Sequence, residues 1–409
     1  MLRIALVTNE LPPYRLPLFR MLAAAPGIEL QVLFCSRREP NRQWELPPLE
    51  FEHVFLNEHI FSVGGRYIHS NPEVIPALRR FGPHVIITGG FNPTHLYAFA
   101  YARWHRVPHI AMTDGTDRSE HGLSALHRQV RRFVYRRSHA FVAASEGGIR
   151  LYRRYGVPPE ACFRSPLCVD NTAFAPLPGA ARARSLDLLF CGRLEEVKGP
   201  LFALEVAAET ARRLGRRVSI AFVGNGSQEQ AIRSGAERYR DLIAPSFHGF
   251  LSHAQLPEFY RAARVFLFPT SGDAWGVVAN EACAAGVPVI VSPHAGAAGE
   301  LVVDGWNGFV CELDRRPWAQ HASMLLSQQE AWQRFSSNAL RAAAGYEYAN
   351  AAAALIAACR HAVAGAPRLL AKAGRESEEA RDESARKKTR GACHRGSNPH
   401  QEEGRRRGS

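Results

Sequence analysis

The sequence lacks any run of about 18 consecutive apolar residues, the length that a membrane-spanning helix needs. Its apolar start, residues 2–7, is also too short for the core of a signal peptide. None of the eight cysteines forms a CxxC pair, and most of them lie in apolar runs typical of buried, reduced thiols. We therefore expect a cytoplasmic protein that neither spans a membrane nor is exported.

Glycine and proline are scattered rather than periodic, which excludes a fibrous repeat. Apolar residues make up 46% of the chain and charged residues 22%, a globular composition that excludes global disorder. The length of 409 residues is sufficient for two domains of about 100 to 200 residues, so a small disulfide-stapled scaffold is excluded as well.

The chain carries 51 Lys and Arg against 38 Asp and Glu, a net charge of +13 that favours anionic partners. Residues 367–409 alone hold 12 Lys and Arg against 7 Asp and Glu, with few large apolar residues, so we expect a disordered basic tail. Much of the remaining positive charge lies in one helix, without interleaved aromatic residues or a recognition motif. A nucleic-acid-binding protein is therefore the weaker alternative, and we expect no specific nucleic acid partner.

Short apolar runs alternate with helical stretches twice along the chain. Strands buried on both faces read as continuous apolar runs, and their alternation with helices predicts parallel sheets with crossover helices. We therefore expect an α/β fold with two doubly wound, Rossmann-like domains. The strand candidates are residues 2–8, 30–35, 84–88, 109–113 and 140–144 in the first half, and 186–191, 218–223, 265–268 and 287–292 in the second.

Composition also divides the chain into segments. We expect domains at 1–170 and 186–345, because residues 171–185 between them are rich in proline, alanine and glycine. A helical stretch at 346–366 precedes the tail. Within the second domain, Pro200 suits a first helical turn, and Ser227 and Ser252 are expected to cap helices.

The loop GRLEEVKG at 192–199 follows a predicted strand and precedes a predicted helix. At the carboxyl end of a parallel strand it occupies the position where doubly wound sheets bind ligands. It carries Arg193 and Lys198, five residues apart, a pair that suits a diphosphate. The competing interpretation is that both are ordinary solvated loop cations.

Two further loops follow predicted strands. FVGNG at 222–226 ends a strand with two glycines, which permit close approach of a ligand. The second loop, residues 269–276, precedes a helix at 277–285, whose first amides form an anion site. This places Asp273 and Glu281 as two carboxylates beside a phosphate site.

Together GRLEEVKG (192–199), FVGNG (222–226), HGF (248–250) and PTSGDAWGVVANEACAAGVPVI (269–290) resemble the retaining nucleotide-sugar glycosyltransferases of the GT-B fold, group 1 or family four. The resemblance implies two Rossmann-like domains facing each other across a cleft. The first is acceptor-side, the second binds the nucleotide sugar, and the helix at 346–366 crosses back to the first. This chain departs from the family pattern in having Asp273 where Glu is commoner.

The resemblance also implies roles for individual residues. Arg193 and Lys198 bind the donor diphosphate, Glu281 the ribose hydroxyls, and Asp273 the hydroxyls of the transferred sugar, so that Asp273 and Glu281 are the catalytic candidates. Transfer is retaining and needs neither metal nor cofactor, with a UDP- or GDP-sugar as co-substrate and a glycan or lipid-linked acceptor. The remaining donor-binding candidates are Gly192, Gly224, Gly226, Trp275, Gly276 and Val277.

The acceptor-side candidates lie in two loops of the first domain. One follows the first strand, where a proline-stiffened turn is an equally good interpretation. The other, at 113–122, includes His121, at a place where the family commonly has a histidine that contacts the donor sugar; the competing interpretation is a solvated loop histidine. The candidates are Asn9, Tyr14, Arg15, Asp114, Asp117 and, as a catalytic residue, His121.

Residues 127–137 read HRQVRRFVYRR and predict a basic amphipathic helix. Such a helix suits the surface of an anionic membrane, which would make the protein peripheral on the inner face of the membrane; equally, its apolar stripe could pack on the sheet. For the whole chain, the alternative enzyme is a nucleotide-sugar epimerase of the same architecture, which would convert donor without acceptor.

Overall fold

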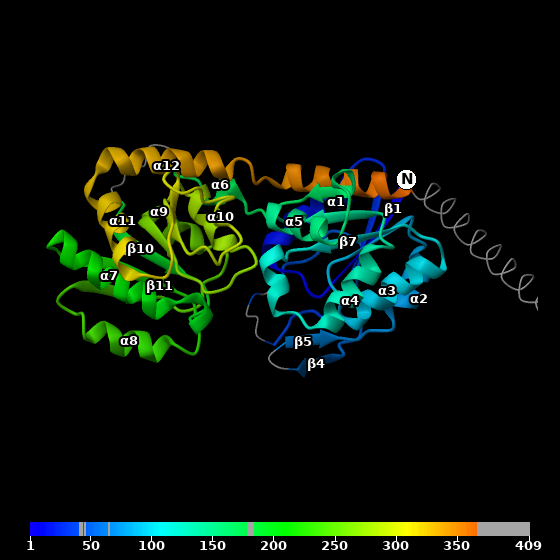
Figure 1. The fold of residues 1–409 in the computed structure, drawn as a ribbon, viewed down its shortest axis with the longest axis horizontal. Coiled ribbons are helices and arrows are strands. Elements are labelled where there is room, and N and C mark those ends of the chain that lie inside the picture. Colours follow the sequence, from blue (N-terminus) through cyan, green and yellow to red (C-terminus); the bar gives the residue numbers. More distant parts are fainter. Residues whose placement is uncertain (41–43, 45, 64–65, 178–183, 366–409) are drawn as a thin grey trace, which may run out of the picture. The chain divides into compact units, whose positions relative to one another are not determined.

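The structure is a computed structural model that describes residues 1–40, 44, 46–63, 66–177 and 184–365 (Figure 1). Contacts divide the chain into two compact units, residues 1–363 and 364–409. The first unit contains both large sheets. The predicted basic tail at 367–409 lies outside the described residues.

The first sheet has seven parallel strands in the order β3-β2-β1-β6-β7-β8-β9. The order reverses between β1 and β6, where Ile4 of β1 lies between Leu30 and Val85. Its strands are β1 (Leu2–Thr8), β2 (Ile28–Phe34), β3 (His53–Phe55), β6 (Val85–Thr88), β7 (His109–Thr113), β8 (Ala140–Ala143) and β9 (Cys162–Arg164). A separate antiparallel hairpin pairs β4 (Ile60–Val63) with β5 (Arg66–His69).

The second sheet has six parallel strands in the order β12-β11-β10-β13-β14-β15, and this order reverses between β10 and β13. Its strands are β10 (Leu186–Cys191), β11 (Val218–Val223), β12 (Ile243–Phe247), β13 (Ala263–Phe268), β14 (Val289–Val291) and β15 (Gly308–Val310). Two parallel, doubly wound sheets confirm the predicted fold class.

Helices form most of the crossover connections between successive strands. Those before β10 are α1 (Leu16–Ala23), α2 (Val74–Phe81), α3 (Pro93–Trp104), α4 (Ala125–Tyr135), α5 (Glu146–Arg154) and α6 (Asn171–Phe174). Those after it are α7 (Pro200–Leu214), α8 (Glu229–Glu237), α9 (Leu256–Ala262), α10 (Val277–Ala284), α11 (Arg315–Ser327) and α12 (Gln329–Ala343). Helix α6 lies between the two sheets along the chain, whereas α11 and α12 follow the last strand. Short 3-10 turns include η2 (Asp117–Gly122) and η4 (Glu196–Lys198), and residues 348–363 are helical.

Both sheets are covered by helices on each face, which is why their strands read as continuous apolar runs. In β1, Ile4 and Leu6 pack with α1 and with the helix at 348–363, while Ala5 and Val7 pack with α2 and α3. In β10, Leu188 packs with α7 and α11. The apolar core therefore lies in one layer above and one below each sheet.

Some local predictions were wrong. Ser227 and Ser252 do not cap helices, because α8 begins after Gln228 and α9 after Gln255. The Ser227 hydroxyl instead donates to Glu195 at 2.6 Å. Residues 171–174 of the predicted linker form the short helix α6, which Asp170 caps, and the linker at 171–185 itself stays a prediction. The domain boundaries at 170 and 345 stay predictions.

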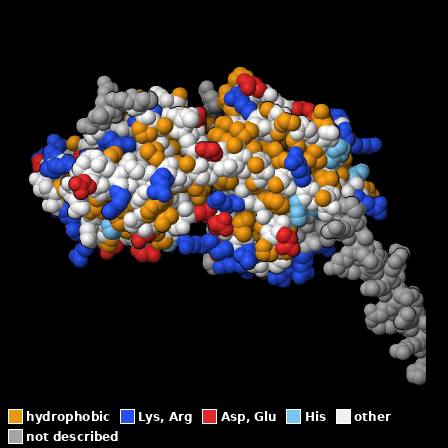
Figure 2. Space-filling model, turned by 90° about the horizontal axis from the view of Figure 1, so that it is seen from above, with side chains coloured by type: hydrophobic (Ala, Val, Ile, Leu, Met, Phe, Trp, Pro, Cys, Tyr) orange, Lys and Arg blue, Asp and Glu red, His pale blue; other side chains and the backbone are white. Residues whose placement is uncertain are grey.

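Charged side chains are spread over the surface. The face shown in Figure 2 carries Lys and Arg at many separate places, with Asp and Glu among them. No helix in the described part of the chain is long and apolar enough to cross a membrane.

Candidate active site

Three loops of the second domain meet at the carboxyl ends of β10, β11 and β13. The amide of Gly192 donates to the carbonyl of Val223 at 2.9 Å, and that of Ser271 donates to the carbonyl of Val197 at 2.8 Å. The three loops predicted to bind the donor are therefore neighbours. They lie where the strand order reverses, the usual ligand site of a doubly wound sheet.

Gly224 and Gly226 are required by the packing of these loops. A Cβ on Gly224, whose φ is +130°, would lie 2.0 Å from the carbonyl oxygen of Gly192. A Cβ on Gly226 would lie 2.4 Å from that of Leu194. No side chain fits at either distance, so both glycines serve to bring the 222–226 loop onto the 192–199 loop.

A cavity of about 380 Å³ opens beside these loops. Its walls include four predicted donor-binding residues, Gly192, Arg193, Gly224 and Gly226. Aromatic side chains add to them: Phe250 from the segment after β12, and Trp44 from the first domain. The cavity thus combines an arginine, close backbone and aromatic surface, which is the chemistry that a nucleoside with phosphates requires.

Lys198 and Asp273 form an ion pair. The Nζ atom of Lys198 lies 2.5 Å from Oδ2 of Asp273, and the two side chains are 18% and 22% exposed. The other carboxylate oxygen, Oδ1, accepts a hydrogen bond from the amide of Trp275 at 3.2 Å. The predicted diphosphate cation and the predicted sugar-binding carboxylate are therefore in direct contact.

Helix α10 starts at Val277, as predicted, and its capping residue is Gly276. Gly276 has a φ of +97°, and a Cβ there would lie 2.2 Å from the ring of Phe268. The first amides of a helix have no acceptor within the helix. Gly276 and Val277 therefore remain candidates for binding the donor through their backbone.

Glu281 is buried within α10. The hydroxyl of Tyr260 donates to its Oε2 atom at 2.7 Å. Burial raises the pKa of Glu281 to about 7, although the Tyr260 hydrogen bond opposes the rise. Burial likewise raises the pKa of Cys191 to about 12, with a further contribution from Glu281, and Cys191 lines the 380 Å³ cavity. Cys191 also packs against the apolar cluster that contains Tyr260, the hydrogen-bond partner of Glu281.

The structure narrows the expectation for Trp275 to its backbone. Its side chain is 1% exposed and packs in the core against the ring of Tyr346. Its indole Nε1 donates to the side chain of Asn280 at 2.7 Å. Such a side chain cannot stack on a bound donor, so only the backbone of Trp275 stays a candidate.

The loops of the first domain that hold acceptor-side candidates also come together. The buried guanidinium of Arg15 contacts the carboxylate of Asp114. Burial alone would lower the pKa of Arg15, but Asp114 raises it above its ordinary value. Asn9 accepts a hydrogen bond from Asn92 at 3.1 Å, and the carbonyl of Tyr14 accepts one from Tyr348 at 2.9 Å. Arg15 and Tyr14 thus make structural contacts, which their predicted acceptor role does not explain.

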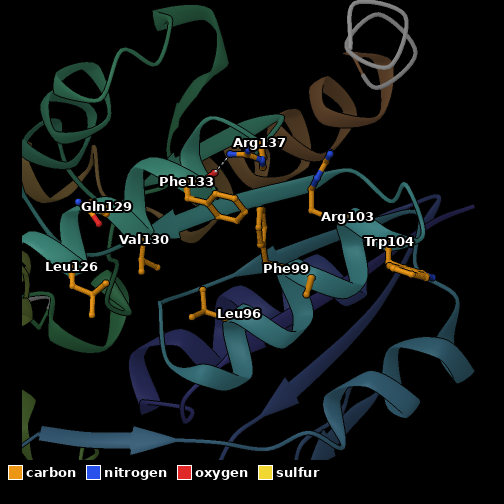
Figure 3. A pocket seen from close by; sticks show the side chains of 10 residues that line it. Leu96, Phe99, Arg103, Trp104, Leu126, Gln129, Val130, Phe133 and Arg137 are labelled. Carbon is orange, nitrogen blue, oxygen red and sulfur yellow. Dashed lines mark hydrogen bonds between the residues drawn. The ribbon is translucent and has the colours of Figure 1, made fainter. Parts of the chain in front are cut away.

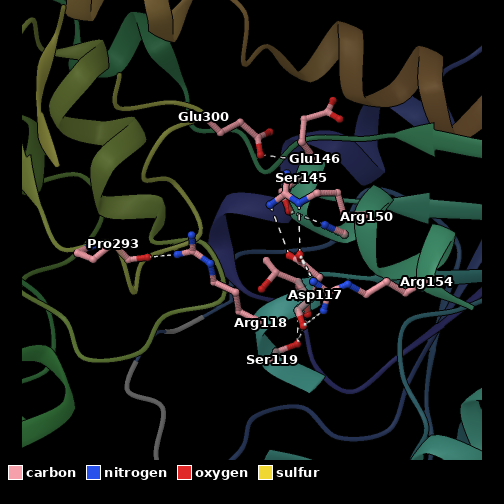
Figure 4. Close-up of polar contacts among 11 residues, drawn as sticks. Asp117, Arg118, Ser119, Ser145, Glu146, Arg150, Arg154, Pro293 and Glu300 are labelled. Atoms are coloured by element: carbon pink, nitrogen blue, oxygen red, sulfur yellow. Dashed lines mark hydrogen bonds and ion pairs between the residues drawn. The ribbon is translucent and has the colours of Figure 1, made fainter. Parts of the chain in front are cut away.

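A larger cavity, of about 760 Å³, is lined by residues of both domains. It contains Asp273 from the second domain, and Asp117, Arg118 and Arg150 from the first. Asp117 was an acceptor-side candidate; the two arginines were not. Arg118 contacts the carbonyl of Pro293, which is visible in Figure 4. The only sequence feature that could have indicated them is their position. Arg118 directly follows Asp117, and Arg150 lies on α5, the helix after β8.

Two remaining site predictions concern His121 and the binding of a metal ion. The side chain of His121 lies outside the described residues, so its predicted contact with the donor sugar stays a prediction. Among the side chains that the structure describes, no three His, Cys, Asp or Glu residues are grouped to hold a metal ion.

The fold and the site together define a class. The crystal structure of Anabaena Alr3699/HepE in complex with UDP and glucose is similar to this chain with a TM-score of 0.67. The likeness covers 87% of this chain and 98% of that one at 16% identity, and it shows the fold. The protein has the GT-B architecture of glycosyltransferases, with two Rossmann-like domains.

Sequence comparison then gives the family. The family described as "Glycosyl transferases group 1" matches residues 179–342, and "Glycosyl transferase 4-like domain" matches residues 12–167. The chain belongs to the group 1 glycosyltransferases, as its motifs predicted.

Curated relatives match about half of the chain. A glycogen synthase of Mycobacterium tuberculosis is 29% identical over 225 residues, 52% of this chain and 53% of that protein. A D-inositol 3-phosphate glycosyltransferase of Frankia alni is 32% identical over 211 residues, 48% of this chain and 52% of that protein. The chain thus spans about half the length of the curated relatives it matches.

Proposed function

We propose that the protein is a glycosyltransferase that moves a hexose or N-acetylhexosamine from a UDP- or GDP-sugar to a saccharide or lipid-linked glycan acceptor. The observation that carries this proposal is the contact between Lys198 and Asp273. It puts a cation suited to a diphosphate beside a carboxylate suited to sugar hydroxyls, on adjoining loops at the switch point of the sheet. The similar structure of HepE binds UDP and glucose, which supports a nucleotide sugar as the donor.

Each proposed role follows from charge and position. As the anomeric bond breaks, the leaving nucleoside diphosphate gains negative charge. Arg193, Lys198 and the first amides of α10 are donors that would stabilise this charge more strongly in the transition state than in the ground state. Asp273 would accept hydrogen bonds from the transferred sugar, and Glu281 from the ribose.

We further propose that the transfer retains the anomeric configuration and needs no metal ion. The cations Arg193 and Lys198 would neutralise the diphosphate in place of a metal. The departing phosphate would take the proton of the acceptor hydroxyl on the same face of the sugar, so that no protein nucleophile is needed. The only co-substrate is then the nucleotide sugar.

A membrane surface is the proposed place of action, on the cytoplasmic side. Helices α3 and α4 border a groove of about 690 Å³ with apolar side chains (Figure 3). Trp104, Leu126 and Phe133 line this groove and are 86%, 68% and 52% exposed, respectively. Exposed apolar groups of this size gathered in one place mark an interaction surface.

The charge around the groove favours an anionic lipid surface as its partner. Residues 93–113 and 123–145 contain seven arginines and no Asp or Glu. Arg103 and Arg137 line the groove itself, and no carboxylate of the described residues lies within ion-pair distance of either. Val134 of the predicted apolar stripe is buried, whereas Phe133 is not. Helix α4 therefore both packs on its own domain and presents apolar and basic groups outward.

Sedimentation with lipid vesicles tests the membrane proposal. Wild-type protein should co-sediment at low salt with vesicles of phosphatidylglycerol and phosphatidylcholine, but not with phosphatidylcholine alone. The double variant Trp104→Ser, Phe133→Ser should lose this binding. The control Leu177→Ser, which changes an apolar residue elsewhere that is 57% exposed, should retain it. Binding that is equal in all three proteins would show that this groove is not the contact.

Thermal stabilisation by nucleotides tests the donor site. A ligand that binds only the folded protein raises the midpoint of unfolding by mass action. We expect UDP or GDP, but not CMP, to raise it, equally with and without EDTA, and Lys198→Ala to reduce the rise. The absence of any rise in folded protein would contradict the proposed donor. Conversion of a UDP-sugar to its epimer without acceptor would instead identify an epimerase.

A further inference from the structure

The 760 Å³ cavity carries groups that donor binding does not use. Of the proposed donor-site residues, Asp273 lines its second-domain side, which also carries the carboxylate of Glu312. On the first-domain side it is lined by Asp117, Arg118 and Arg150, none of which has a role in the donor site proposed above. These charged side chains therefore face the cavity without an assigned function.

Asp117 holds two arginines at once, as Figure 4 shows. Its carboxylate accepts from Nε and NH2 of Arg150 at 3.3 and 3.4 Å, and from NH2 of Arg154 at 3.2 Å. The Asp117 side chain is only 9% exposed, whereas each arginine side chain is 57% exposed. Two guanidinium groups therefore share one carboxylate, which leaves one positive charge in excess.

Arg150 is oriented by this arrangement. Because Nε and NH2 bind Asp117 as a fork, the NH1 group points elsewhere, and no acceptor in the described part of the chain lies within hydrogen-bond distance of it. A guanidinium fixed in this way loses little freedom when it binds a carboxylate or phosphate. The arginine is thus both accessible and pre-organised.

Close packing fixes the loop that carries Asp117 and Arg118. A Cβ on Gly147, in the first turn of α5, would lie 2.9 Å from Thr116, so glycine there lets the loop rest directly on the helix. Arg118 extends from this loop to the carbonyl of Pro293. The next residue, His294, accepts a hydrogen bond from the amide of Asp273 at 3.2 Å. Arg118 therefore stands beside the loop of the proposed sugar-binding carboxylate.

We propose that the first-domain wall of this cavity is a binding site for an anionic group of the acceptor, a phosphate or a carboxylate, held by Arg150 and Arg118. This inference rests on the proposed function, because it places the acceptor opposite the donor. The anion would bind the guanidinium groups by charge-assisted hydrogen bonds. The hydroxyl to be glycosylated would then extend toward the sugar held at Asp273. The acceptor class is thereby narrowed to phosphorylated or acidic saccharides and lipid-linked glycans with a phosphate.

The test uses the full chain saturated with UDP, so that the diphosphate site is already filled. Sodium phosphate is titrated at constant ionic strength, and the midpoint of thermal unfolding is followed. Wild type should show a saturable rise, and Arg150→Gln should bind phosphate about tenfold more weakly. Arg153→Gln removes the same charge from an exposed position of the same helix and should behave as wild type. Should Arg150→Gln fail to fold, Arg118→Gln gives the same comparison.

The outcomes separate this inference from the function on which it rests. Failure of UDP itself to stabilise the protein would contradict the proposed function. Stabilisation by UDP, with a phosphate effect equal in wild type and Arg150→Gln or absent in both, would overturn the inference alone.

A second comparison identifies which substrate carries the anion. Wild type and Arg150→Gln are each titrated with UDP-glucose and UDP-glucuronate, which differ by one carboxylate on the sugar. We expect Arg150→Gln to leave the ratio of the two affinities unchanged. A selective loss of UDP-glucuronate binding would place the anion on the donor sugar and overturn the assignment to the acceptor.

Discussion

The ammonium group of Lys198 lies 2.5 Å from the carboxylate of Asp273, a residue 75 positions further along the chain. One belongs to the loop after β10 and the other to the loop after β13, the two strands between which the sheet order reverses. Each group therefore limits what the other can bind. A diphosphate must share Lys198 with Asp273, and a sugar hydroxyl must share Asp273 with Lys198.

Substitutions at this pair should have opposite effects on nucleotide binding. Asp273→Asn keeps the shape of the side chain but removes its charge, so Lys198 becomes wholly available and UDP should bind severalfold more tightly. Lys198→Met removes the cation, and UDP should bind about tenfold more weakly. Both variants should transfer sugar poorly. Calorimetric titration with UDP checks the prediction, and weaker binding by both variants would show that the pair acts as one unit.

Glu281 should make stability depend on pH. Burial raises its pKa from 4.5 to about 7, so the folded protein holds this proton more tightly than the unfolded chain does. Stability is therefore lost as the pH rises from about 4.5 to about 7, and the whole loss is present above that range. The size of the effect is about 3 kcal/mol.

The variant Glu281→Gln isolates this effect. Gln cannot ionise, yet its carbonyl oxygen can still accept the hydrogen bond of Tyr260. The difference in unfolding midpoint between the variant and wild type should be near zero at pH 4.5 and should grow in favour of the variant up to about pH 7.5. A constant difference over this range would show that Glu281 does not titrate there. Other titrating groups are the same in both proteins and cancel.

Gly224→Ala should be strongly destabilising, because the new Cβ would lie 2.0 Å from a backbone oxygen. The matched control is Gly215→Ala. Gly215 also has a positive φ, of +64°, but a Cβ there meets nothing within 4 Å. The control should cost about 1 kcal/mol from backbone strain alone, and Gly224→Ala at least about 2 kcal/mol more. Equal unfolding midpoints of the two variants would contradict the close packing of the two loops.

Trp275→Phe tests whether Trp275 belongs to the core rather than to the donor site. The substitution removes the hydrogen bond to Asn280 and leaves a small void, so the protein should lose about 2 kcal/mol of stability. The affinity for UDP should stay within about twofold of wild type, because the side chain points into the core. A large loss of UDP binding with an unchanged unfolding midpoint would return the side chain to the donor site.

Much of the fold could be predicted because both sheets are parallel and covered on both faces. Strands such as β1 and β11 then read as unbroken apolar runs, and glycine or proline marks where the chain leaves them. Six strands escaped prediction. β3, β9 and β15 have three residues each and β4 and β5 have four, too few for a clear pattern. β12 lies at the edge of its sheet and reads IAPSF, a partly exposed run that a proline interrupts. The donor loops could be placed for the same reason, since each follows a strand at the binding edge of the sheet.

What the sequence by itself determined is therefore the class of fold, the family motifs and the loops that carry them, because these depend on local pattern and on position after a strand. Only the tertiary structure decided which side chains meet. The pairing of Lys198 with Asp273, the burial of Trp275 and the fork between Asp117 and Arg150 join residues from separate elements. Such contacts depend on the order of the strands and on close packing between loops, which no stretch of local sequence specifies.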